Sequence, residues 1–122
     1  MGVEALAFGI NQTKSSYLIT SGDQLPKVQK ILDKVPHLKT LIVFTDKFTE
    51  KNLIDFKAKA TSLTVYSFNQ VEDIGQKTDI IENYTSPKKD DLAIIMYTSG
   101  STGNPKGRHF FRYSVFSSRH IL

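Results

Sequence analysis

The chain has 122 residues, of which 39% are apolar and 23% charged, a composition typical of one globular domain with a modest core. It contains no cysteine, which excludes a disulfide framework and any metal site built on thiolates. The net charge of +4 comes from residues 106–122, which hold one lysine, three arginines and no acidic residue, because twelve lysines balance twelve acidic residues in residues 1–105.

The first residues are expected to be neither a secretory leader nor a membrane anchor. The opening "MGVEALAFGI" has no basic flank and contains Glu4, unlike a signal peptide. The longest apolar run, residues 92–97, has the length of a strand and falls far short of the roughly 18 residues of a membrane-spanning helix. Residues 3–10 are compatible with one helix of the fold.

A strand is predicted over residues 16–20, "SYLIT", with a helix directly after it. Ser21 and Asp23 can each accept hydrogen bonds from the free N–H groups of a starting helix. Apolar residues then recur at steps of three and four, the pattern of one buried helix face. These residues are Leu25, Val28, Ile31, Leu32 and Val35. Pro36 lies just beyond them, where helices usually stop.

The alternation of strands and helices continues along the chain. Strands are predicted over residues 40–45 and 63–68, and between them lies a helix that Thr49 can cap. A short helix over residues 70–77 and an exposed loop over residues 85–90 come next.

Residues 91–99, "DLAIIMYTS", form the fourth predicted strand. Strands that are separated by helices favour parallel pairing, because a parallel pair needs a long crossover connection. The predicted fold class is therefore α/β, a partial, open and mostly parallel sheet with flanking helices.

The fourth strand leads into a loop with the composition of a phosphate-binding site. Its hydroxyl and glycine residues are Thr98, Ser99, Gly100, Ser101, Thr102 and Gly103. Hydroxyl groups and exposed N–H groups bind anions, and glycines allow close approach of the backbone. Lys106 adds a positive charge, and Pro105 stiffens the turn that presents it. In an open α/β sheet, ligands bind beyond the carboxyl ends of the strands, which is where this loop begins.

Two other interpretations of the loop were compared with this one. A flexible Ser/Gly linker has a similar composition but does not need the lysine and proline. A Walker A loop is excluded, because Pro105 stands five residues after Gly100 and because Gly107, rather than Ser or Thr, follows Lys106. The dinucleotide pattern G-x-G-x-x-G is absent as well.

Residues 97–107, "YTSGSTGNPKG", resemble the signature of the adenylate-forming enzymes, which include acyl-CoA synthetases, luciferases and the adenylation domains of peptide synthetases. All eleven positions fit. The preceding "DDLAIIM" and the upstream order of "EALAFGIN", "YLITSGDQLPKVQKIL" and "LKTLIVF" look most like the long-chain fatty acyl-CoA synthetase branch. The resemblance covers about residues 4–107.

The resemblance implies a two-step ligation that uses ATP and Mg²⁺. A long-chain fatty carboxylate attacks the α-phosphate of ATP to give an acyl-adenylate and pyrophosphate, and the thiol of CoA then displaces AMP. ATP, the fatty acid and CoA are thus the expected partners, and no nucleic acid is expected. The full-length enzyme is expected at the cytoplasmic face of the endoplasmic reticulum or mitochondrial outer membrane, held by segments outside this sequence. The chain itself is expected to be cytosolic or unstable.

The resemblance also implies roles for individual residues of the loop, which closes over the β- and γ-phosphates. The implied nucleotide-binding residues are Thr98, Ser99, Gly100, Ser101, Thr102, Gly103, Lys106 and Gly107. Lys106 would balance the charge on the departing pyrophosphate, an electrostatic role. No residue is assigned to a metal, because His109 and His120 lie eleven residues apart with no carboxylate nearby.

We divide the chain into a partial AMP-binding domain, residues 1–107, and a divergent basic and aromatic tail, residues 108–122. Family members continue past the motif with an apolar stretch and a histidine, and His109 comes too early for it. The later motifs for adenine and ribose and the mobile C-terminal domain have no counterpart. The expectation is a catalytically incomplete fragment of a long-chain fatty acid–CoA ligase.

Alternatives to this interpretation remain open at the level of sequence. The chain could be a non-enzymatic truncated isoform that binds polyphosphate or the full-length enzyme. The tail could bind RNA or anionic lipid through aromatic residues among its arginines, or it could be an unselected sequence left by splicing or gene-model truncation. The aromatic residues are Phe110, Phe111, Tyr113 and Phe116.

Overall fold

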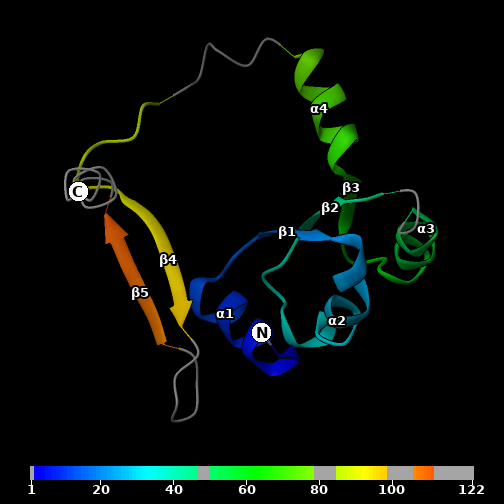
Figure 1. Ribbon diagram of the computed structural model, residues 1–122, viewed down its shortest axis with the longest axis horizontal. Coiled ribbons are helices and arrows are strands. Elements are labelled where there is room, and N and C mark those ends of the chain that lie inside the picture. Colours follow the sequence, from blue (N-terminus) through cyan, green and yellow to red (C-terminus); the bar gives the residue numbers. More distant parts are fainter. Residues whose placement is uncertain (1, 47–49, 79–84, 99–105, 112–122) are drawn as a thin grey trace. The chain divides into compact units, whose positions relative to one another are not determined.

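The computed structural model divides the chain into two compact units, Met1–Asp79 and Ile80–Leu122, here called unit 1 and unit 2 (Figure 1). The residues that the structure describes are 2–46, 50–78, 85–98 and 106–111. No helix within these residues is long and apolar enough to cross a membrane.

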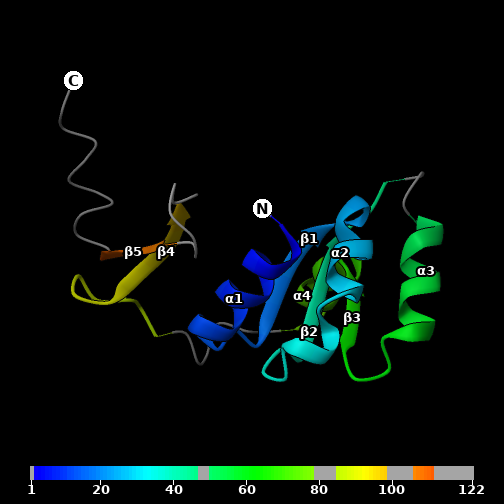
Figure 2. The same ribbon diagram turned by 90° about the horizontal axis from the view of Figure 1, so that it is seen from below.

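Unit 1 is built on a three-stranded parallel sheet in the order β1-β2-β3. The strands are β1 (Tyr17–Ser21), β2 (Thr40–Phe44) and β3 (Thr64–Ser67). The helices around this sheet are α1 (Val3–Thr13), α2 (Leu25–Gln29), α3 (Glu50–Lys59) and α4 (Phe68–Gln76) (Figures 1 and 2). Each parallel connection contains a helix, as the crossover requires. The predicted fold class, and its first three strands, are thus confirmed.

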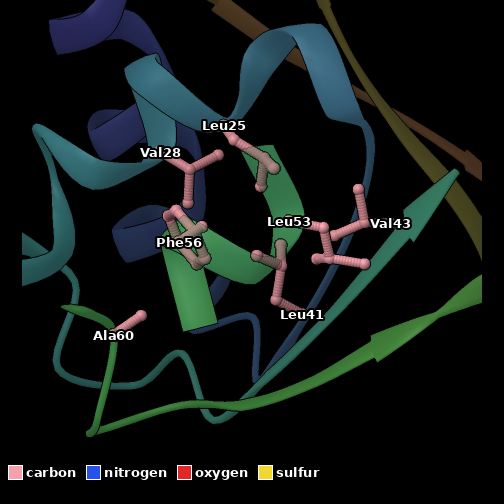
Figure 3. Close-up of a cluster of buried hydrophobic side chains, with 7 residues drawn as sticks. All are labelled: Leu25, Val28, Leu41, Val43, Leu53, Phe56 and Ala60. Atoms are coloured by element: carbon pink, nitrogen blue, oxygen red, sulfur yellow. The ribbon is translucent and has the colours of Figure 1, made fainter. Parts of the chain in front are cut away.

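Two clusters of buried side chains make up the core of unit 1. In the first, side chains from α2 and α3 meet β2 from one face of the sheet (Figure 3). Its members are Leu25, Val28, Leu41, Val43, Leu53, Phe56 and Ala60. The second cluster lies under α1 and contains Ala7, Ile10, Ile31, Val35 and Leu38. Burial of each large side chain stabilises the fold by about 1.5–3 kcal/mol.

The single helix predicted from the apolar face after Asp23 is wrong, because α2 ends at Gln29. A 3₁₀ turn, Leu32–Lys34, follows it. The break has a packing reason. Val28 belongs to the first core cluster, whereas Ile31, with no exposed surface, belongs to the second. Leaving the helical path lets one apolar run serve both clusters, which its periodicity alone cannot reveal.

The second cluster is also tied to α1 by polar contacts. Asn11 Nδ2 donates a hydrogen bond of 2.8 Å to the carbonyl oxygen of Lys34, and Lys34 Nζ forms an ion pair of 2.8 Å with Glu4. That hydrogen-bonded carboxylate raises the pKa of Lys34. Because both ends of the ion pair are exposed, its contribution to stability is small.

Helix α4 begins on the face of the sheet opposite the first cluster. Side chains alternate along a strand, so Phe44 points away from Val43, and its ring stacks on Phe68 with centroids 4.3 Å apart. A capping box starts the helix: Ser67 Oγ accepts from the Gln70 N–H at 3.3 Å, and Gln70 Oε1 accepts from the Ser67 N–H at 2.9 Å. The predicted cap of α3, Thr49, lies outside the described residues.

Unit 2 contains a two-stranded antiparallel sheet formed by β4 (Leu92–Thr98) and β5 (Lys106–Phe111). The expectation that the fourth strand joins the parallel sheet is therefore corrected, since β4 pairs with a strand that the sequence did not predict. Only residues 99–105 join the two strands, too few for a parallel crossover but enough for a hairpin. The loop predicted over residues 85–90 is confirmed as irregular and exposed.

The first core cluster yields a test of this fold. Leu41→Ala removes a side chain with no exposed surface at the centre of the sheet, and we expect it to lower the free energy of unfolding by about 2–5 kcal/mol. Ile54→Ala is the matched control, because Ile54 is 64% exposed and should change stability by less than about 1 kcal/mol. Urea unfolding followed by circular dichroism measures both. Equal losses would contradict the assignment of Leu41 to the core.

Candidate phosphate-binding loop

The hairpin of unit 2 closes the base of the predicted phosphate loop. Thr98, the last residue of β4, stands directly opposite Lys106, the first residue of β5. Tyr97 and Gly107 form the next pair. The structure thus brings together Thr98, Lys106 and Gly107 in the backbone ladder. The remaining predicted loop residues lie outside the described residues, namely Ser99, Gly100, Ser101, Thr102 and Gly103.

The pair of Thr98 and Lys106 sets the distance between the two ends of the loop. Cα atoms of directly opposite residues in an antiparallel ladder are about 4.5–5.5 Å apart. Lys106 follows Thr98 by eight positions in the sequence, yet its backbone is that close to the hydroxyl-bearing end of β4. Lys106 therefore stands at the same end of the hairpin as Thr98.

The helix cap predicted at Ser21 and Asp23, at the end of β1, differs from expectation. Ser21 stands at the N-cap of a 3₁₀ turn, Gly22–Gln24, but its side chain makes no capping hydrogen bond. Its hydroxyl instead donates to the carboxylate of Asp23, and Gln24 Nε2 donates to the same carboxylate. The bond from Ser21, and then that from Gln24, hold the pKa of Asp23 below its ordinary value of 3.8. The short side chains bind each other in preference to the turn's N–H groups.

A hollow of about 230 Å³ lies at the carboxyl ends of β2 and β3, where ligands of parallel sheets often bind. It is lined by Thr45, Glu50, Leu53, Ile54, Lys57, Ser67, Asn69 and Gln70. Lys57 Nζ already donates to Gln70 Oε1 at 3.4 Å, and the carboxylate of Glu50 would repel an anion. The hollow therefore suits a phosphate less well than the loop does.

Across the described ranges, no group of three or more His, Asp or Glu residues could hold a metal ion. His109 lies in β5 opposite Ile95. His120 lies outside the described residues.

The family model described as AMP-binding enzyme matches residues 1–113. The chain belongs to the AMP-binding enzyme family, which confirms the resemblance carried by the motif. The match includes all of β5, and the division of the chain at residue 107 stays a prediction.

Curated relatives with similar sequences are named as fatty acyl-CoA synthetases. Long chain acyl-CoA synthetase 8 of Arabidopsis thaliana is 36% identical over 107 residues, which are 88% of this chain and 14% of that protein. Fatty acyl-CoA synthetase B of Dictyostelium discoideum is 34% identical over 88% of this chain and 16% of its own length. Long-chain-fatty-acid–CoA ligase 6 of Homo sapiens is 33% identical over 88% of this chain and 15% of its own length. The chain thus spans 14% to 16% of the length of these relatives.

Solved structures show the same fold. The adenylation domain of a carboxylate reductase from Mycobacterium chelonae superposes with a TM-score of 0.81 at 22% identity, over 94% of this chain and 19% of that one. The A-PCP didomain of carboxylic acid reductase from Segniliparus rugosus, in complex with AMP, gives a TM-score of 0.78 at 21% identity, over 96% of this chain and 18% of that one.

Sequence reasoning missed β5 and with it the partner of Tyr97. One signal was available: two runs with strand character, on either side of a short segment containing Gly and Pro, indicate a hairpin with a longer loop. Gly107 and the basic residues of β5 weakened that signal, because glycine and lysine are depleted in strands.

The contacts of Asp23 give a pH-dependent prediction. A lowered carboxyl pKa contributes stability above the unfolded value, about 3.9, and this contribution is lost as the pH falls through the folded value. Ser21→Ala removes the largest cause, so the pKa of Asp23 should rise. Lys27→Ala, which removes the weakest cause, should raise it less. NMR titration of the Asp23 carboxyl carbon measures the pKa in both variants. An equal rise in the two would contradict the conclusion that Ser21 lowers this pKa more than Lys27 does.

Proposed function

We propose that the chain is part of the AMP-binding domain of a long-chain fatty acid–CoA ligase and that its loop, residues 98–107, binds the β- and γ-phosphates of ATP. The observation that carries this proposal is the pairing of Thr98 with Lys106 inside the region that matches the family model. The names of the curated relatives support the choice of a fatty acid and CoA as the other substrates.

The loop's chemistry suits a polyphosphate. Its hydroxyl groups come from Thr98, Ser99, Ser101 and Thr102, and Gly100, Gly103 and Gly107 offer backbone N–H groups close to the ligand. The substrate is ATP with its Mg²⁺. The Mg²⁺ neutralises only part of the negative charge of ATP, and the positive charge of Lys106 balances some of the remainder. Each charge-assisted hydrogen bond contributes roughly 1.5–3 kcal/mol, so a few of them hold the nucleotide.

The proposed reaction has two steps. A carboxylate oxygen of the fatty acid bonds to the α-phosphorus of ATP while the bond to pyrophosphate breaks, and the CoA thiol then attacks the acyl carbon and releases AMP. Negative charge collects on pyrophosphate in the first step, and Lys106 stabilises that charge. The proposed location, at the cytoplasmic face of the endoplasmic reticulum or mitochondrial outer membrane, refers to the longer protein.

The binding proposal is tested with pyrophosphate and the chain as it stands. Lys106→Ala should weaken pyrophosphate binding roughly ten- to a hundredfold, because it removes one charge-assisted contact. Lys88→Ala is the control, since it removes the same charge from the exposed segment 85–90 and should have little effect. Isothermal titration calorimetry measures both affinities. Equal affinities for the two variants, or no binding by the unaltered chain, would contradict the proposal.

A second test addresses the share of the reaction that this chain performs. It covers only 14% to 16% of its relatives' length, so we propose that it holds phosphate without completing the ligation. With ATP, Mg²⁺, a long-chain fatty acid and CoA, the chain should release no pyrophosphate beyond the Lys106→Ala background. Fatty-acid-dependent release well above that background, in a coupled phosphate assay, would show a complete active site.

A further inference from the structure

The ladder step next to the loop joins an aromatic residue to a glycine. Tyr97 of β4 stands directly opposite Gly107 of β5, one step from the closing pair of Thr98 and Lys106. Glycine weakens a strand, because it has no side chain to pack and loses more backbone freedom than other residues. The strand that carries Lys106 is thus weakest directly after Lys106.

Tyr97 and Ile95, which lie on one face of β4, are both half-buried. Ile94 and Met96, which alternate with them, are 47% and 53% exposed. Directly opposite residues put their Cβ positions on the same face, about 4.5–5.5 Å apart. Gly107 has no Cβ, so no side chain stands opposite Tyr97 in the ladder. An aromatic ring placed across a glycine in this way shields the ladder hydrogen bonds from water.

We propose that Tyr97 is a positioning residue for Lys106: its ring covers the backbone of Gly107 and holds β5 in register with β4. This inference rests on the proposed phosphate-binding function, because it concerns the lysine of that site. Tyr97 acts through Lys106 and does not contact the phosphate.

Register matters at this position for a geometric reason. A slip of one residue turns every side chain of a strand to the other face. Such a slip would replace the pair of Thr98 and Lys106 by a pair of Thr98 with a neighbour of Lys106. Lys106 would then no longer stand opposite Thr98 in the ladder, and polyphosphate binding would weaken. A two-stranded sheet has few other contacts that prevent slipping.

The test compares three variants of the whole chain, Tyr97→Ala, Tyr97→Phe and Met96→Ala. One readout needs no ligand, namely hydrogen exchange measured by NMR at the β5 amide that donates to β4, which is either Lys106 or Gly107 because only one of two neighbouring amides points at the partner strand. The other is pyrophosphate affinity measured by calorimetry. Tyr97→Ala should speed exchange at that amide and weaken binding, each by a factor of about three to five, as expected for one cross-strand pair. Tyr97→Phe keeps the ring and should restore both values, and Met96→Ala should leave both unchanged.

The outcomes separate this inference from the proposed function. If the unaltered chain does not bind pyrophosphate, the proposed function fails, and the exchange rates still decide whether Tyr97 holds the register. If the chain binds and Tyr97→Ala leaves exchange and affinity unchanged, the inference is overturned. It is also overturned if Met96→Ala matches Tyr97→Ala, if Tyr97→Phe fails to restore exchange, or if the amide that donates to β4 exchanges freely in the unaltered chain.

Discussion

The antiparallel pairing of Thr98 with Lys106 is the constraint on which the candidate site depends. Residues 99–105 are too few to carry β5 back alongside β4 in parallel, so the chain must reverse and pair as a hairpin. The reversal places the start of β5 beside the end of β4. It therefore sets Lys106 opposite Thr98.

The two units differ in what stabilises them. The described part of unit 1 has twelve buried hydrophobic residues in two clusters, and its helices cover the strands that its parallel connections create. In unit 2, the described part of β4 has no buried side chain, and Leu92, Ile94 and Met96 are about half exposed. Its register must come from ladder hydrogen bonds and local cross-strand pairs. The pair next to the loop, Tyr97 with Gly107, therefore contributes more to the register than a single pair would in a strand fixed by a buried core.

Much of the fold could be predicted because its signals are local. β-rich runs located four strands, and a three- and four-residue period located the buried residues of α2 and those on either side of the 3₁₀ turn, Ile31 and Val35. The break after Gln29 could not be predicted, because it depends on Ile31 and Val28 serving different clusters, a tertiary fact. The loop's residue types predict a phosphate site, and this site stays a prediction. That Lys106 faces Thr98 across a ladder was not foreseen, because glycine and charged residues hide the strand character of β5.

The charge pattern fits the hairpin's geometry. Residues 1–105 have no net charge, and the basic segment begins at Lys106, the residue that the ladder places beside the loop. A single cation is a weak attractor in water, but its effect increases where N–H and hydroxyl groups surround the same anion and exclude solvent. Under the proposed function, an element of this kind would stabilise a departing pyrophosphate and would supply neither a nucleophile nor a proton acceptor. Aligning the carboxylate and the thiol of the proposed reaction would then depend on residues outside the loop, so a phosphate loop alone specifies the leaving group and not the acyl chain.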